Sequence, residues 1–242
     1  MAEQPLDGRR IVVTRPEAKP LADELERLGA EVTIVPLIEI RPAEDRRALE
    51  EAVRDMPRYD WIVLTSVNGV SAVSDGLVGP GGSARVAAVG PVTADAVRRH
   101  GVEPAFVAAR ASDDIAGGLG ELDGRRVLLP QADIADPALA EELRGQGAQV
   151  DVVVAYRTVH VEPPMWGILP LRIADAVVLA SGSACRSLAA AGGAGGAALL
   201  VCIGPKTAKV AREVGLHVGL VADETTADGI IRTLVSHFGE NT

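Results

Sequence analysis

The chain has 242 residues, of which 48% are hydrophobic and 24% charged, so it can form a folded core and is long enough for two domains. Its formal net charge is −9 and only 2% of its residues are aromatic. This argues against nucleic acid as a partner, because phosphates need a basic face and bases need aromatic platforms. The first residues lack the pattern of a signal peptide, and no apolar run reaches the ~18 residues that span a bilayer. We therefore expect a cytoplasmic protein with no membrane association.

The predicted elements repeat along the chain. Four segments of the first half are similar, in the same order, to four segments of the second half: 8–16, 21–35, 59–70 and 86–108, then 124–132, 139–153, 174–185 and 200–222. Both copies contain the sequence V/I-G-P-x-T-A. Because four matched segments in one order rarely arise by chance, we interpret the chain as two copies of one unit.

Each copy contains short strands that are apolar on both faces. In chain order they are 11–14, 32–36, 61–65, 86–90, 127–130, 150–156, 176–180 and 200–204. Amphipathic helices alternate with them. We expect one helix to begin at Thr93 and end at Gly101, and another to begin at Thr207 and end at Gly215. Continuous apolar strands alternating with helices predict open parallel sheets covered on both faces.

The motifs of several common enzyme classes are missing. The chain has neither the G-x-G-x-x-G fingerprint nor the G-x-x-x-x-G-K-[ST] phosphate loop, which disfavours a nicotinamide or ATP enzyme, and it has no G-x-S-x-G nucleophile elbow. Its histidines are scattered and suggest no metal site: they are His100, His160, His217 and His237. Cys185 and Cys202 have no metal-ligand spacing, and we interpret them as two buried small side chains.

Polar loops follow the predicted strands. Ligands of open α/β sheets bind at the carboxyl ends of the strands, so these loops are the candidate binding site. Thr65 and Ser66 could either cap the following helix or hold a substrate carboxylate with their hydroxyls and nearby N–H groups. The same two interpretations apply to hydroxyl residues of the other loops: Thr93, Thr207, Ser181 and Ser183.

Several segments together resemble the uroporphyrinogen-III synthase family: RRIVVTRP (9–16), VPLIEIRP (35–42), DWIVLTSVNGV (60–70), VAAVGPVTADAV (86–97), VVVAYRTV (152–159), VVLASGSA (177–184) and VCIGPKTA (201–208). The resemblance extends from about residue 8 to residue 235. It implies two open parallel-sheet α/β domains of flavodoxin-like type, joined by a two-stranded antiparallel linker. Domain one would comprise residues 1–37 and 161–242, domain two residues 42–155, and the linkers would lie near 38–41 and 156–160. The sequence repeat and the spatial domains would then be out of phase.

The resemblance also implies a reaction. The family converts the linear tetrapyrrole hydroxymethylbilane into uroporphyrinogen III, with loss of water and inversion of the last pyrrole ring, and uses no cofactor or metal. Such a catalyst mainly folds its substrate and prevents direct closure to the wrong isomer. Tyr156 matches the family's most influential catalytic side chain, whose phenol would protonate the leaving hydroxyl or hydrogen-bond to it. We expect a monomer that transiently contacts the preceding enzyme of the pathway.

The substrate-binding residues that the resemblance implies lie in the polar loops: Arg15, Thr65, Ser66, Asn68, Gly90, Thr93, Ser181, Gly182, Ser183, Lys206 and Thr207. Arg15 is the leading cation for a substrate carboxylate, whereas Lys206 could equally be a solvated surface residue. Many family members carry an arginine shortly after the Thr-Ser pair, where this chain has Val67-Asn68-Gly69. The role of that arginine is therefore lost or moved in this chain.

The acidic balance of the chain constrains how it would hold a substrate with eight carboxylates. Residues 41–160 contain 13 basic and 18 acidic groups, a net charge of −5, and the remaining residues contain 11 and 15, a net charge of −4. Neither part is a basic receptor, so long-range attraction of the substrate should be weak. We expect recognition by backbone N–H groups at helix N-termini, by hydroxyls and by a few basic side chains.

Two other kinds of function share this architecture. One is a two-domain binding protein that closes on a small ligand, but such proteins are usually exported. The other is a non-catalytic relative kept as a regulatory domain, which would be favoured if Tyr156 and the Ser/Thr loops did not face a common cleft. A flavodoxin-like electron carrier is disfavoured because its loops would need aromatic residues to stack on a flavin.

Overall fold

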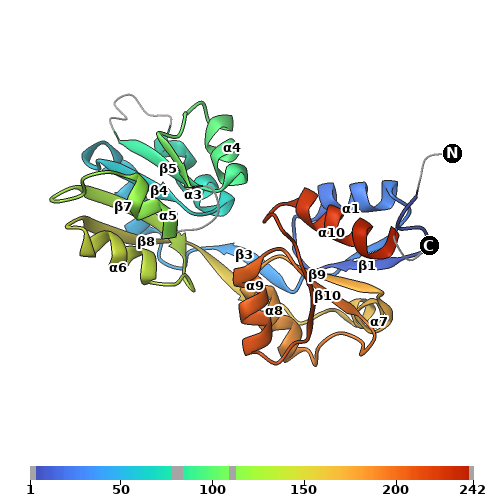
Figure 1. Cartoon of the computed structure of the whole chain (residues 1–242). Coiled ribbons are helices and arrows are strands. Elements are labelled where there is room, and N and C mark those ends of the chain that lie inside the picture. Colours follow the sequence, from blue (N-terminus) through green and yellow to red (C-terminus); the bar gives the residue numbers. More distant parts are fainter. Residues whose placement is uncertain (1–3, 78–83, 109–112, 240–242) are drawn as a thin grey trace. The chain divides into compact units, whose positions relative to one another are not determined.

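The computed structural model describes residues 4–77, 84–108 and 113–239, and the chain divides into two compact units. Unit 1 comprises Met1–Glu39 and Val159–Thr242, and unit 2 comprises Ile40–Thr158. Unit 1 is therefore formed from both ends of the chain, and unit 2 is inserted into it (Figure 1).

Unit 1 contains a five-stranded sheet in the order β11-β10-β9-β1-β2. Its strands are β1 (Arg10–Val13), β2 (Glu31–Ile34), β9 (Ala176–Leu179), β10 (Leu199–Cys202) and β11 (Val218–Val221). All neighbouring strands are parallel. Numbered within the unit, the order is 2-1-3-4-5, which is the flavodoxin-like order of doubly wound sheets.

Helices cover both faces of this sheet (Figure 1). The first core contains the apolar sides of α1 (Lys19–Arg27) and α10 (Ala227–Gly239). The second contains those of α7 (Met165–Ile173), α8 (Gly182–Ala190) and α9 (Pro205–Glu213). The strands alternate between the two cores: Ile11 and Val13 face the first and Val12 faces the second. Strands with apolar residues on both faces are thus buried on both faces, as the sequence predicts.

Unit 2 contains a six-stranded sheet in the order β3-β8-β7-β4-β5-β6. Its strands are β3 (Ile38–Pro42), β4 (Trp61–Leu64), β5 (Arg85–Val89), β6 (Phe106–Ala108), β7 (Arg126–Ala132) and β8 (Gln149–His160), of which β3 begins and β8 ends in unit 1. The strands from β8 to β6 in this order are parallel to their neighbours. β3 lies at the edge of the sheet beside β8.

The unit 2 sheet also lies between two helical layers. On one face are α5 (Asp113–Gly118) and α6 (Ala138–Gly145). On the other face are α2 (Arg47–Arg54), the 3-10 helix η1 (Met56–Arg58), α3 (Val67–Leu77) and α4 (Pro91–Arg99). Each unit is therefore a helix–sheet–helix sandwich with its own pair of cores.

The sequence repeat is out of phase with the two units. In unit 1, β1 and β2 come from the first half of the chain, and β9, β10 and β11 come from the second. In unit 2, β4, β5 and β6 come from the first half, and β7 and β8 from the second. Apart from the edge strand β3, both sheets have the same strand order. In unit 1, β9 of the second copy pairs with β1 of the first, and in unit 2, β4 of the first copy pairs with β7 of the second.

Two sequence predictions about helix starts are wrong by two residues. α4 begins at Pro91 and α9 at Pro205, with Gly90 and Gly204 as the N-cap residues and no side-chain cap. Proline is preferred at the first position of a helix because its fixed φ fits and its missing N–H is not needed there. The predicted ends are confirmed, since Gly101 and Gly215 have φ of 76° and 80°, the left-handed region that closes helices.

Candidate functional site

The loop after β4 begins the candidate site in unit 2. Thr65 and Ser66 are half-buried at the carboxyl end of this strand. Ser66 caps α3, because its Oγ accepts a hydrogen bond from the Gly69 N–H at 3.0 Å. A Cβ atom on Gly69 would lie 3.2 Å from the Pro130 carbonyl oxygen and 3.4 Å from Ser66 Oγ. Glycine at this position therefore lets the first turn of α3 pack closely against β7.

Tyr156 lies beside this loop. Its Oη is 2.9 Å from Ser66 Oγ, although the two residues are 90 positions apart in sequence. The register of β8 against β7 shifts just before Tyr156, so that Val154 pairs with Gln131 but Tyr156 pairs with Ala132. Irregularities of this kind redirect side chains. Ala155 and the partly buried Tyr156 consequently pack against the same core although they are consecutive in sequence.

The surroundings of Tyr156 shift its pKa in opposite directions. Burial raises the pKa, while hydrogen bonding to Ser66 and to the side chain of Asn68 lowers it and the charge of Asp133 raises it. The net result is a pKa above that of an ordinary tyrosine. The phenol is therefore protonated at neutral pH and has a proton to donate.

An ion-pair cluster that sequence reasoning missed lies next to Tyr156. Arg157 pairs with Glu44 and with Asp133, the latter at 3.6 Å. Asp133 also accepts the Thr158 N–H at 3.1 Å, and its own N–H donates to the Tyr156 carbonyl at 3.1 Å. The loop after β7 thus holds the carboxyl-terminal part of β8. The signal in the sequence was a charged residue directly after Tyr156, but its partners could not be identified from spacing.

The loop after β5 contributes a helix start. Gly90 has φ of 78° and precedes the proline at which α4 begins. Thr93 lies in the first turn of α4 and is only 5% exposed. Its burial gives it a packing role in the α4 layer, and the capping role considered for it does not apply because Gly90 is the cap.

In unit 1 the loop after β9 has the same construction as the loop after β4. Ser181 caps α8, its Oγ accepting the Ala184 N–H at 3.2 Å. A Cβ atom on Gly182 would lie 3.0 Å from Val210, so this glycine allows α8 and α9 to approach. The Ser183 carbonyl accepts the Ser187 hydroxyl at 3.1 Å. Ser187 Oγ in turn lies 2.6 Å from His160 Nδ1, a contact that sequence reasoning did not anticipate.

The remaining candidates of unit 1 follow β1 and β10. Arg15 is exposed just beyond the end of β1, and Lys206 is exposed in the first turn of α9. Thr207, the residue after Lys206, is 7% exposed, and Gly204 rather than Thr207 caps the helix. Of the three candidates in these two loops, Arg15 and Lys206 are exposed and Thr207 is buried.

The cysteines are buried and free, as the sequence predicts. Cys185 is 3.6 Å from the Thr207 carbonyl, towards which its thiol points. Within the part of the chain that the structure describes, there is no group of three or more metal-ligating side chains. Among the same residues, no helix is both long and apolar enough to cross a membrane.

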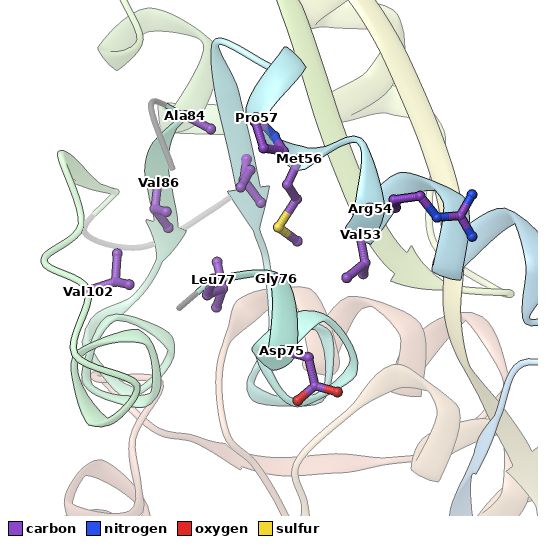
Figure 2. Close-up of a pocket in the computed structure, with 11 residues that line it drawn as sticks. Val53, Arg54, Met56, Pro57, Asp75, Gly76, Leu77, Ala84, Val86 and Val102 are labelled. Carbon is purple, nitrogen blue, oxygen red and sulfur yellow. The ribbon is translucent and has the colours of Figure 1, made fainter. Parts of the chain in front are cut away.

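A separate apolar pocket of about 290 Å³ lies in unit 2. Its lining includes Val53, Met56, Ile62, Leu77, Val86 and Val102. Figure 2 shows the Met56 side chain among the other apolar side chains and the Arg54 guanidinium extending away from them. Ile62 and Val86 are near the amino-terminal ends of β4 and β5, whereas the candidate residues follow the carboxyl ends. The pocket is therefore distinct from the candidate site.

The fold defines a duplicated, discontinuous α/β protein whose polar loops gather at the carboxyl ends of two parallel sheets. The family model described as "Uroporphyrinogen-III synthase HemD" matches residues 19–232. The uroporphyrinogen-III synthase of Synechococcus elongatus is 29% identical in an alignment of 256 positions that covers 96% of each chain. The porphyrin biosynthesis protein HemD of Ruminiclostridium josui is 30% identical in an alignment of 260 positions that covers 99% of this chain and 50% of that protein.

Solved structures have the same fold. A mutant uroporphyrinogen III synthase from the extreme thermophile Thermus thermophilus matches with a TM-score of 0.66 at 18% identity, covering 97% of this chain and 100% of that one. The uroporphyrinogen-III synthetase of Helicobacter pylori matches with a TM-score of 0.63 at 16% identity, covering 95% and 99%. The chain belongs to the uroporphyrinogen-III synthase family, which places it among the enzymes of tetrapyrrole synthesis.

Proposed function

We propose that this protein converts hydroxymethylbilane into uroporphyrinogen III and that Tyr156 assists the departure of the hydroxyl group. The observation that carries the proposal is the position of the Tyr156 phenol. It lies at the carboxyl end of the unit 2 sheet, hydrogen-bonded to the Ser66 cap at 2.9 Å. Family membership over residues 19–232 supports the substrate and the reaction.

The proposed reaction loses one molecule of water. The bond between the terminal methylene carbon and its hydroxyl oxygen breaks, and the departing hydroxide takes the Tyr156 proton. The azafulvene cation left behind is attacked by the substituted carbon of the last pyrrole, which gives a spiro intermediate. This intermediate fragments and closes again with that ring inverted, and the proton released when the ring becomes aromatic returns to the phenolate. Atoms and charge therefore balance without an external reagent.

Substrate carboxylates would be held by local donors in each unit. In unit 2 these are the N-termini of α3 and α4, with Thr65 and Gly90. In unit 1 they are the N-termini of α8 and α9, with Ser181 and Ser183, together with the exposed cations Arg15 and Lys206. Helix N-termini bind anions through free N–H groups and the helix dipole. This mode of binding suits a chain whose net charge is −9.

An isomer assay tests the proposal. Hydroxymethylbilane is generated in situ, the purified protein is added, and the products are oxidised and separated by chromatography into type I and type III isomers. We expect the type III isomer, whereas the same mixture with heat-inactivated protein should give type I by spontaneous closure. Type I product alone in both mixtures would refute the assignment and favour a non-catalytic, ligand-binding relative.

A further inference from the structure

The contact between Tyr156 and Ser66 is part of a longer chain of hydrogen bonds. Ser66 Oγ accepts the Gly69 N–H at 3.0 Å and lies 2.9 Å from Tyr156 Oη. A serine hydroxyl has one proton, so only one direction of the Ser66–Tyr156 bond leaves the tyrosine proton available to another group. If Tyr156 donates to Ser66, the phenol proton is occupied inside the protein. If Ser66 donates to Tyr156, that proton is free.

Two neighbours favour donation by Ser66. The Gly69 N–H that donates to Ser66 belongs to the first turn of α3, an 11-residue helix whose N-terminus carries positive potential. In addition, the side chain of Asn68, in the same turn, lowers the pKa of Tyr156, as Ser66 does. A chain of bonds that all point one way is strengthened by mutual polarisation.

We propose that Ser66 is a positioning residue that receives the Gly69 N–H and donates its own proton to Tyr156, which directs the phenol proton towards the substrate. This inference rests on the proposed function for the identity of the proton acceptor, and it reassigns Ser66 from substrate binding to the support of Tyr156. Asn68 assists from the same turn of α3.

The effect of Asp133 on the Tyr156 pKa is opposite to that of Ser66 and Asn68. The carboxylate of Asp133 raises the Tyr156 pKa, as burial does, while Ser66 and Asn68 lower it. Arg157 lies 3.6 Å from Asp133 and offsets part of its charge. Removing the Ser66 donor should therefore raise the Tyr156 pKa further, because one of the two groups that lower it would be lost. The phenol should then ionise at a higher pH.

The chain is well suited to a direct test because Tyr59 and Tyr156 are its two tyrosines. In protein labelled with carbon-13 at tyrosine Cζ, each phenol gives its own titration curve by NMR. Tyr156→Phe assigns the signals by removing one of them, and the remaining signal is that of Tyr59, whose pKa burial and Asp151 raise to about 12. We expect Ser66→Ala to move the Tyr156 titration to higher pH and Ser66→Thr, which keeps the hydroxyl, to restore it.

Matched variants separate this effect from the loss of a helix cap. Thr226 caps α10 in the same way, its Oγ1 accepting the Gly229 N–H at 3.0 Å, so Thr226→Ala should leave the Tyr156 titration unchanged. Ser66→Gly keeps a residue that is tolerated at an N-cap and should reproduce the shift if Ser66→Ala folds poorly. A Tyr156 titration in both Ser66→Ala and Ser66→Gly at or below the wild-type pH would overturn the proposal.

The isomer assay adds a second, independent readout. We expect Ser66→Ala to lower kcat for the type III product roughly tenfold, the effect of losing one hydrogen bond to a developing negative charge, with a smaller change in KM. Wild-type kcat in Ser66→Ala, despite a shifted titration, would overturn the catalytic part of the inference. Failure of the wild-type protein to form the type III isomer would instead refute the proposed function and leave the titration result standing.

Discussion

The Asp175 carboxylate accepts a hydrogen bond from the backbone N–H of Arg10 at 2.8 Å. Asp60 accepts the backbone N–H of Arg126 at 2.9 Å in the same way. The two aspartates hold matching places in the repeat, directly before β9 and β4, and the two arginines begin β1 and β7. Each aspartate thus binds the first strand of the other copy. In each sheet, such a hydrogen bond joins strands that come from different copies of the repeat.

Replacing Asp175 with asparagine should destabilise unit 1. Burial alone raises the Asp175 pKa, but the N–H and guanidinium of Arg10 outweigh it, so the pKa is lowered overall. A lowered folded-state pKa contributes stability at neutral pH that is lost as pH falls through that pKa. We expect Asp175→Asn to lower the free energy of unfolding by about 1 kcal/mol at pH 7, and the two proteins to converge in acid. Urea unfolding at several pH values measures both effects.

The control for this prediction is Asp23→Asn. Asp23 pairs with Lys19 on the exposed face of α1, and its side chain is 55% exposed. An exposed pair of this kind contributes little, so the variant should unfold with wild-type parameters. An Asp175→Asn deficit that stayed constant down to acid pH would show that the charge of Asp175 is not its source.

Tyr156→Phe should abolish most turnover without unfolding the protein. The ring packs against the unit 2 core and is kept, while the proton donor is lost. General acid assistance is typically a factor of 10²–10⁴, so we expect kcat to fall about 100-fold or more. Because the Tyr156 pKa is raised, chiefly by burial, wild-type kcat should stay level through neutral pH and decline only in alkali. Full turnover in Tyr156→Phe would remove this residue from the mechanism.

Tyr59→Phe is the matched control for the loss of a phenol. The Tyr59 hydroxyl donates to Asp151 at 2.8 Å and is buried in the same core. Its removal should lower stability modestly, because a buried hydrogen bond is lost, and leave kcat within a factor of about two. Circular dichroism and urea unfolding of both variants would show whether either loss of turnover reflects unfolding.

How far the sequence could predict this molecule depends on the kind of contact. Strands such as β4 and β9 were predictable because a strand buried on both faces must be apolar throughout. The Tyr156–Ser66 bond was not, since it joins strands that are separated by β7 in the sheet and depends on the register shift before Tyr156. No periodicity in one segment reports the register of another.

The roles of the threonines in the duplicated loops were also not predictable from the sequence, although these contacts are local. Thr93 and Thr207 follow Gly-Pro in identical settings, and the sequence could not decide whether they cap, bind or pack. The start of each helix at the proline excludes capping, because the threonine is then inside the first turn and is buried, while substrate binding by either threonine stays a prediction. Arg157 and Asp133 form their pair across a bulged strand junction, which likewise has no local signature.

Lys206→Ala should weaken substrate binding rather than chemistry. Lys206 is exposed in the first turn of α9, where its charge adds to the positive end of the helix. An exposed ion pair is worth up to about 1 kcal/mol, so we expect KM to rise about threefold with kcat unchanged, and the difference to shrink in high salt. Steady-state kinetics at two ionic strengths measure this.

Lys209, one turn further along α9, provides the comparison for Lys206. It is 78% exposed and lies 3.9 Å from Glu213, away from the start of the helix. Lys209→Ala removes the same charge from the protein and should leave KM unchanged. Equal effects of the two substitutions would mean that net charge, and not the position of Lys206, governs binding.

Gly195→Ala should destabilise unit 1, whereas Gly196→Ala should not. A Cβ atom on Gly195 would lie 2.0 Å from the Arg172 carbonyl oxygen, while one on Gly196 would meet nothing within 4 Å. The Gly195 N–H also donates to the Leu171 carbonyl at 2.9 Å, so the turn cannot move away without losing that bond. We expect about 1–3 kcal/mol of lost stability for Gly195→Ala and less than about 0.5 kcal/mol for Gly196→Ala in urea unfolding. Because the two glycines are adjacent and neither has a positive φ, backbone entropy is matched, and equal stability of the two variants would show that the turn is not held against the end of α7.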